Sequence, residues 1–206
     1  MNKKDKPIVN PQDIAKLLAS DPSIARIHSE YGAPPNWERP QGFESLSLII
    51  LEQQVSLASA QAHYQKLKQY IAEFTPHNIL LQSDEEMRNC FISRQKSSYL
   101  RALAQAIVNR ELIIENLGGC DELQVRNQLQ KIKGIGNWTC DIYLMFCMQY
   151  KDIIPLGDIA ILNSIKKIYQ LNDKASILLY AQAYWSPYRS LASYYLWHHY
   201  LSSRRK

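Results

Sequence analysis

Apolar residues recur at intervals of three and four along nearly the whole chain, the spacing that places them on one face of an α-helix. No stretch of useful length alternates apolar and polar residues as a half-buried strand does. Asn10-Pro11 and Asp21-Pro22 each combine a helix-capping side chain with a proline suited to the first turn. The pattern predicts an all-α fold whose first two helices begin at these pairs, with the second ending near Gly32.

Capping residues and helix breakers divide the remainder of the chain. Residues 33–40 contain Pro34, Pro35 and Pro40 and are expected to form an extended connector. Ser83 and Glu86 have the spacing of a capping box, and a break is expected at Gly118-Gly119. The helices expected after the connector cover about 43–53, 57–74, a segment after 83, a long segment from 93, 121–132 and 137–150, followed by three that begin near 158, 174 and 187.

The composition favours a polyanionic binding partner and argues against a metal centre. The formal net charge is +5 and the pI about 8.9, which suit a polyanion. The four cysteines, at 90, 120, 140 and 147, have neither zinc-site nor iron–sulfur spacing, and no Cys/His cluster accompanies them. We therefore expect no metal held by side chains and no required cofactor.

The chain shows no signal peptide, and its longest nearly uncharged apolar stretch, 142–150, is too short to cross a bilayer. We expect a monomeric cytoplasmic protein without membrane contact, associated with the nucleoid if it is bacterial. A length of 206 residues allows one domain or two lobes that share a cleft.

The segment KIKGIGNWT, residues 131–139, predicts two helices joined by a tight hairpin. Glycines at 134 and 136 can adopt backbone conformations closed to other residues. The amide groups at the start of the second helix would then face outward and favour an anion, with Lys131 and Lys133 adding positive charge. Gly-x-Gly alone is also compatible with an ordinary interhelical turn.

The sequence around and beyond this hairpin resembles the helix-hairpin-helix DNA glycosylases, and among them the 3-methyladenine (alkylated-base) type. The resemblance covers roughly residues 33 to 201 and rests on matches in family order. These are Leu51-Glu52-Gln53-Gln54-Val55-Ser56, residues 93–100, Gly134-Ile135-Gly136-Asn137-Trp138-Thr139, Pro155-Leu156-Gly157-Asp158-Ile159-Ala160, and Pro187-Tyr188-Arg189-Ser190 leading to Tyr195-Leu196-Trp197.

The resemblance implies an all-α glycosylase fold with a cleft between two helical lobes, of 44–145 and of 1–43 plus 146–206. It implies that Asp158 is the catalytic acid, although an Asp before an apolar helix is also an ideal N-cap. One carboxylate oxygen could serve as the cap while the other faces the cleft. Members of the family that also cut the strand carry Lys where this chain has Trp138, so we expect base release without strand cleavage.

Further roles follow from the same resemblance. Trp138 and Tyr188 are the expected base-pocket aromatics, and Tyr184, Trp185 and Trp37 are weaker candidates. Gln54 is the expected wedge that fills the space of a flipped nucleotide. The residues expected at the DNA backbone are Lys133, Gly134, Ile135, Gly136, Asn137 and Thr139. A K⁺ or Na⁺ ion at the main chain of the hairpin is also implied.

The function that these observations predict is hydrolysis of the N-glycosidic bond of alkylated purines, such as 3-methyladenine and 7-methylguanine, in damaged double-stranded DNA during base excision repair. Two alternatives stay open: a glycosylase for uracil or an oxidised purine, and a DNA-binding protein that uses the hairpin without catalysis. Asp158 separates the last from the others, because a simple binder gains nothing from a carboxylate that faces a polyanion.

Overall fold

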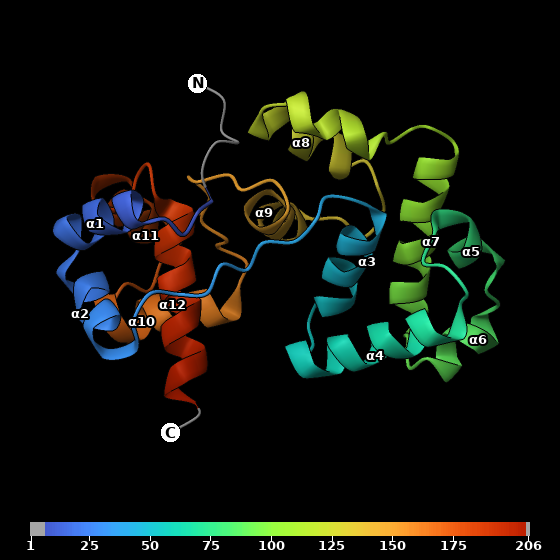
Figure 1. The fold of residues 1–206 in the computed structure, drawn as a ribbon, viewed down its shortest axis with the longest axis horizontal. Helices are drawn as coiled ribbons and strands as arrows, with labels where there is room; N and C mark the ends of the chain where they lie inside the picture. Colours follow the sequence, from blue (N-terminus) through green and yellow to red (C-terminus); the bar gives the residue numbers. More distant parts are fainter. Residues whose placement is uncertain (1–6, 205–206) are drawn as a thin grey trace. The chain divides into compact units, whose positions relative to one another are not determined.

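The computed structural model describes residues 7–204, and within that range the chain is helical with no strand, which confirms the predicted all-α class (Figure 1). None of the helices in this range is both long and apolar enough to cross a membrane. The helices are α1 (Pro11–Ser20), α2 (Pro22–Tyr31), α3 (Phe43–Glu52), α4 (Leu57–Tyr70), α5 (Pro76–Leu81), α6 (Asp84–Asn89), α7 (Arg94–Val108), the 3-10 helix η1 (Ile114–Gly119), α8 (Glu122–Leu129), α9 (Asn137–Phe146), α10 (Ile159–Tyr169), α11 (Lys174–Tyr184) and α12 (Arg189–Ser203).

The capping residues read from the sequence do cap helices. The side chains of Asn10 and Asp21 accept hydrogen bonds from main-chain amides in the first turns of α1 and α2. Ser83 and Glu86 form both hydrogen bonds of the capping box at α6, and Ser93 caps α7. These short-range contacts explain why the starts of helices were predicted well.

The ends of several helices differ from the prediction. The helix expected over 57–74 stops at Tyr70, because Ile71 turns into extended backbone and its side chain is buried. Thr75 then caps a separate helix, α5, which the pattern did not distinguish. The break expected at Gly118-Gly119 is instead the end of η1, and α8 ends at Leu129 rather than 132.

The end of α9 lies four residues before the predicted one, at Phe146, and a side chain accounts for it. Gln149 has a left-handed backbone conformation, with φ of 56°. Its amide nitrogen donates to the carbonyl oxygens of Met145 (3.0 Å) and Phe146 (3.2 Å), and its amide oxygen accepts from the Ile8 main chain (3.0 Å). The side chain thus satisfies carbonyls that a longer helix would otherwise use.

The chain divides into two compact units. The terminal unit contains residues up to Glu38 together with those from Leu144 onward, and the hairpin unit contains Arg39–Tyr143. The two lobes expected from the sequence have slightly different boundaries, because the middle lobe was expected to cover residues 44–145.

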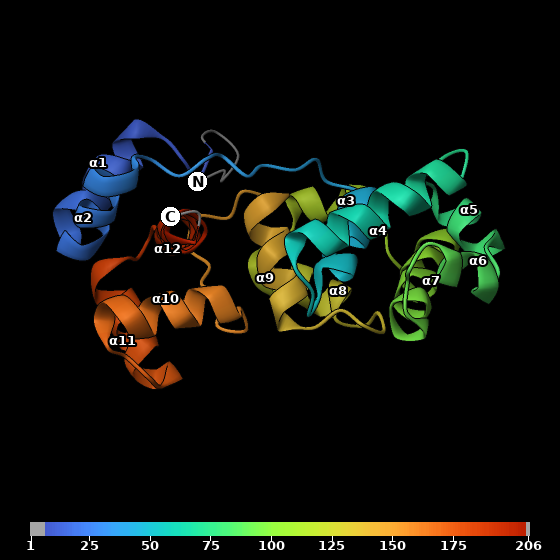
Figure 2. The ribbon, with the colours of Figure 1, turned by 90° about the horizontal axis from the view of Figure 1, so that it is seen from below.

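In the terminal unit, α12 is the central helix and packs against α1, α2 and α10. Figure 2 shows α12 end-on, with α1 and α2 on one side of it and α10 and α11 on another. Its residues from Ser190 to Trp197 are all buried. A helix that is buried on all sides carries apolar and small residues around its whole circumference, which explains the weak amphipathic pattern of this segment.

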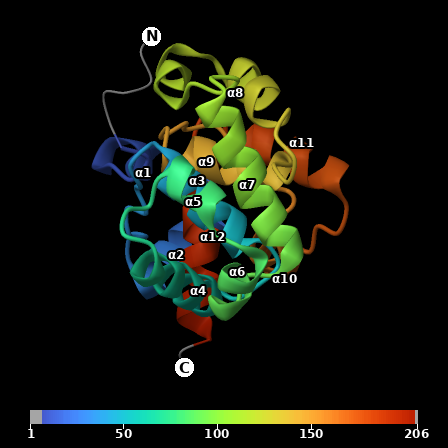
Figure 3. The ribbon, with the colours of Figure 1, turned by 90° about the vertical axis from the view of Figure 1, so that its right-hand side faces the viewer.

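In the hairpin unit, the long helix α7 packs against α3, α5 and α6. Figure 3 shows α7 along its length. Leu100, Leu103 and Ala104 of α7 are buried, as are Leu46 and Ile50 of α3. This packing fixes the end of α3, and with it the turn that follows.

A buried carboxylate organises the outer part of the terminal unit. Asp21 is fully buried and, besides capping α2, accepts hydrogen bonds from the Trp185 indole N–H (2.6 Å) and the Tyr169 hydroxyl (2.9 Å). The Tyr180 hydroxyl contributes a longer one of 3.3 Å. One side chain therefore joins α2 to α10 and α11.

Replacing Asp21 with Ala is expected to lower the free energy of unfolding by about 3 kcal/mol or more, because several buried donors lose their acceptor at once. Urea denaturation measures the change. Asp173→Ala is the matched control: Asp173 caps α11 but is solvent-exposed, so its loss should cost only about 1 kcal/mol. Equal losses in the two variants would contradict the organising role of Asp21.

Candidate functional site

The hairpin between α8 and α9 requires glycine at position 134 for two independent reasons. Gly134 has φ of 92°, a backbone conformation that side chains rarely adopt. A Cβ atom placed there would also overlap the ring of Tyr99 in α7. The turn is therefore pressed against α7, and the tyrosine ring defines its position.

The predicted DNA-backbone residues of the hairpin differ in exposure, and Gly134 is half-buried. Lys133, Gly136 and Asn137 are exposed, whereas the side chains of Ile135 and Thr139 are buried. The Gly136 carbonyl accepts from the Cys140 amide, so α9 begins here and its first amides have no partner within the helix. The buried side chains of Ile135 and Thr139 do not face solvent, so any contact of these residues with a DNA backbone would be through their main chains.

Ionic contacts hold α8 and α9 together behind the turn. The Arg126 guanidinium contacts Asp141 of α9 at 2.5 Å and Glu122 of its own helix at 3.0 Å. Burial raises the pKa of Asp141 to about 6, although Arg126 acts in the opposite direction. The contact fixes the angle at which α9 leaves the turn.

The turn 53–56, after α3, is attached directly to the hairpin. The side-chain amide of Gln53 donates to the Gly134 carbonyl at 2.8 Å and to the Thr139 hydroxyl at 3.0 Å. Both partners belong to the segment that resembles a phosphate-binding hairpin. The side chain of Gln53 therefore joins two loops that lie 81 residues apart in sequence.

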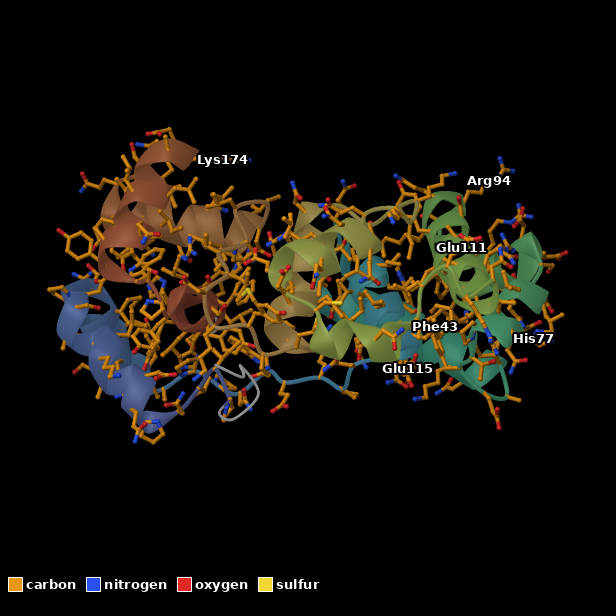
Figure 4. All side chains as sticks on the ribbon, turned by 90° about the horizontal axis from the view of Figure 1, so that it is seen from above. Phe43, His77, Arg94, Glu111, Glu115 and Lys174 are labelled. Atoms are coloured by element: carbon orange, nitrogen blue, oxygen red, sulfur yellow. The ribbon has the colours of Figure 1, made fainter. Side chains whose placement is uncertain are left out.

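Two cationic side chains support the same turn from the α3 side. Arg39 forms a two-pronged ion pair with Glu52, with distances of 2.7 and 2.9 Å. The Lys96 ammonium donates to the Leu51 carbonyl at 2.6 Å, and burial lowers the pKa of this lysine. Lys96 therefore binds the end of α3. Arg94, at the start of the same helix, is exposed and extends outward (Figure 4).

Gln54, the predicted wedge, lies at the tip of this supported turn. It is exposed and has φ of 56°, which costs a non-glycine residue on the order of 1 kcal/mol. Val55 and Leu57 beside it are 39% and 58% exposed. An exposed turn with exposed apolar neighbours is suited to insertion into a stack of bases.

Gln54→Gly separates stability from function. Glycine accepts the left-handed conformation, so the free energy of unfolding should change by less than about 1 kcal/mol. Base release from a lesion-containing duplex should fall at least about tenfold, because nothing then fills the vacated space and unstacking costs a few kcal/mol. Thermal unfolding and single-turnover base release measure the two. Undiminished release would show that Gln54 is not the wedge.

Asp158 is fixed at the start of α10 by two hydrogen bonds to one oxygen. Its Oδ1 accepts from the Ile161 amide at 3.1 Å, which makes it the N-cap expected from the sequence. The same Oδ1 accepts from the indole N–H of Trp197 in α12, also at 3.1 Å. Two rigid donors thus set the orientation of the carboxylate.

The loop that leads to Asp158 is attached to the start of α12. Arg189 forms a two-pronged ion pair with Asp152, at 2.7 and 2.9 Å. The Ser190 hydroxyl donates to the Tyr150 carbonyl at 2.6 Å and accepts from the Ile153 amide at 3.0 Å. The Pro-x-Arg-Ser match therefore positions the backbone that precedes the acid.

Aromatic residues surround Trp197 within the terminal unit. The Trp37 ring centroid lies 6.3 Å from that of Trp197, and the Phe146 centroid lies 5.4 Å away. Tyr188, an expected pocket residue, is half-buried, with the Lys16 ammonium 5.9 Å from its ring centroid. Trp138, the other expected pocket residue, is half-buried on α9 in the hairpin unit.

Sequence reasoning missed two side chains that hold the candidate residues in place. Gln53 stands beside the predicted wedge and was given no role, and Trp197 belonged to a matched motif without one. Their partners lie 81 and 39 residues away. Only the fold reveals these pairs, since neither spacing has a local meaning. Among residues 7–204 no group of His, Cys, Asp or Glu could hold a metal ion.

Several known proteins are similar to this chain. The DNA-3-methyladenine glycosylase of Bacillus subtilis is 27% identical over 175 residues, 77% of this chain and 57% of that protein. DNA-3-methyladenine glycosylase 1 of Schizosaccharomyces pombe is 26% identical over 181 residues, 84% of this chain and 79% of that protein. A solved structure of the fission yeast 3-methyladenine DNA glycosylase with abasic DNA superposes with a TM-score of 0.82, 26% identity and coverage of 90% of this chain and 95% of that one.

The chain spans only part of some relatives. It covers 57% of the Bacillus subtilis DNA-3-methyladenine glycosylase and 66% of a second relative from the same organism. The model of one protein family matches residues 48–188, a range that contains the supported turn, the hairpin and Asp158. The chain belongs to the HhH-GPD superfamily of base excision DNA repair proteins.

Proposed function

We propose that this protein is a monofunctional DNA glycosylase that hydrolyses the N-glycosidic bond of alkylated purines, 3-methyladenine and 7-methylguanine, in double-stranded DNA. The observation that carries the proposal is Asp158, a carboxylate oriented by two donors in a chain that also presents an exposed glycine hairpin. The relatives named as 3-methyladenine glycosylases support the substrate class.

The hairpin would hold the DNA backbone. The exposed start of α9 offers amide N–H groups and the positive end of a helix dipole to a phosphate, and exposed Lys131 and Lys133 add charge. Each neutralised phosphate contributes a salt-dependent share of the affinity. A K⁺ or Na⁺ ion at the hairpin carbonyls belongs to the proposal as well, although the Gly134 carbonyl already accepts from Gln53.

The acid would act on the sugar of the flipped nucleotide. Cleavage of a glycosidic bond develops positive charge on the sugar, as in glycoside hydrolysis. At about 4 Å and an effective dielectric near 20, a carboxylate stabilises a unit positive charge by about 4 kcal/mol, roughly three decades in rate. Alkylated purines already carry positive charge and leave without protonation, so a single acid is sufficient for them.

The aromatic side chains fit the same substrate class. A cationic base gains on the order of 0.5–2 kcal/mol from a face-on aromatic contact. Trp138 and Tyr188 are half-buried, so neither residue is sealed in the core. Trp138 also has no amine, so it cannot form the Schiff base through which a lysine would cut the strand.

A panel of duplexes tests the assignment, each with one modified base: 3-methyladenine, 7-methylguanine, uracil or 8-oxoguanine. We expect free methylated purine and strands that break only after alkali. Release of uracil or 8-oxoguanine alone would replace the substrate class. Binding without release of any base would indicate a non-catalytic DNA-binding protein.

A further inference from the structure

The indole N–H of Trp197 donates to the carboxylate of Asp158. The two residues lie 39 positions apart, on α12 and at the start of α10, and the nitrogen–oxygen distance is 3.1 Å. Trp197 is only 8% exposed. A buried indole N–H needs an acceptor, and here that acceptor is the proposed catalytic group.

The aromatic surroundings of Trp197 fix the direction of its N–H. The rings of Trp37, Phe146 and Tyr194 lie around it, with centroid distances of 6.3, 5.4 and 6.0 Å and interplanar angles of 81°, 65° and 47°. Rings that contact the indole at such different angles leave it little freedom to rotate. The donor is thus held in place independently of the acid.

The second donor to the acid is fixed as well, because the Ile161 amide belongs to the first turn of α10. Both donors bind Oδ1 rather than one oxygen each. A helix cap requires only the main-chain donor. The indole N–H approaches the same oxygen from a second direction, and two donors in fixed positions restrict the rotation of the carboxylate group.

We propose that Trp197 is a positioning residue for the reaction: its indole N–H orients the Asp158 carboxylate toward the sugar of the flipped nucleotide. The inference rests on the proposed glycosylase function. Misplacement of a reacting group by about 1 Å can cost about a hundredfold in rate, so the loss of one of two orienting donors should be measurable in the chemical step.

Trp197→Phe removes the N–H and keeps an aromatic ring in the cluster. We expect the single-turnover rate of methylated-base release to fall between about 10-fold and 100-fold. The Kd for a duplex with an abasic site should change less than about twofold, since positioning residues act on the reaction and not on phosphate contacts. Tyr194→Phe is the matched control, because it removes a polar atom from the same cluster and leaves the Asp158 contact intact; its rate should equal that of the wild type.

A spectroscopic measurement tests the contact without any substrate. The chain has four tryptophans, so a ¹H–¹⁵N correlation spectrum contains four indole N–H signals, and Trp197→Phe identifies the one from Trp197. In Asp158→Ala that signal should move to lower proton shift, as expected when a hydrogen bond to a carboxylate is lost. The Trp185 signal should stay in place, because Trp185 donates to Asp21.

The proposal is overturned if Trp197→Phe releases bases at the wild-type rate, if its rate and DNA affinity fall in parallel, or if the Trp197 signal ignores Asp158→Ala. Failure of the proposed function looks different: wild-type protein would then release no base from any duplex. In that event a shifted Trp197 signal would still uphold the contact with Asp158, and an unshifted one would refute it.

Discussion

Asp158→Asn is expected to lower the single-turnover rate of methylated-base release by about three decades while the protein still binds the duplex. The loss corresponds to about 4 kcal/mol of attraction between the carboxylate and the positive charge that develops on the sugar. Asparagine keeps an oxygen that can accept from Ile161 and Trp197, so the start of α10 should remain intact. Rapid-quench kinetics and a binding titration measure the two properties.

Asp173→Asn provides the matched control for this variant. Asp173 caps α11 as Asp158 caps α10, accepting from an amide three residues later. It is exposed, however, and its second oxygen accepts from the Ser176 hydroxyl of its own helix. Its replacement should leave base release unchanged. A loss of DNA binding in Asp158→Asn, or an equal loss of rate in Asp173→Asn, would show that the effect is one of folding and not of chemistry.

Gly134→Ala is expected to destabilise the hairpin by roughly 2–5 kcal/mol and to lower DNA affinity at least about tenfold. The new methyl group meets the Tyr99 ring, and overpacking of this kind costs about 1–3 kcal/mol. The positive φ adds about 1–2 kcal/mol. Hydrogen exchange of α8 and α9 amides and a binding titration at fixed salt measure the consequences.

The cause of that effect can be separated with two further variants. Gly119→Ala should change neither property, because Gly119 has open space where its Cβ would lie and no positive φ. Tyr99→Ala combined with Gly134→Ala removes the overlap and should restore part of the stability. If the double variant is no more stable than Gly134→Ala, the close approach of Tyr99 is not what requires glycine.

The sequence predicted the fold class and the starts of helices because both depend on short-range physics. Caps such as Asn10 and Ser83 act within three residues, and the 3.6-residue period is local. Helix ends were predicted less well, since Gln149 ends α9 in part through a contact with Ile8, 141 residues away. No local pattern encodes such a partner.

In the candidate site, too, the features with local sequence signals could be predicted and those that depend on distant contacts could not. Asp158 and the glycine hairpin could be found from motifs, and the N-cap role of Asp158 was read correctly. The residues that hold them, Gln53 and Trp197, could not, because their importance lies in distant partners. The roles of Trp138 and Tyr188 in a base pocket remain predictions.

Whether Asp158 drives the release of alkylated bases is tested most directly by comparing wild type with Asp158→Asn on methylated duplex DNA, with and without alkali. We predict free methylated purine from the wild type alone, in strands that stay intact until alkali is added. Equal release by both proteins, or none by the wild type, would contradict the proposed role of this carboxylate.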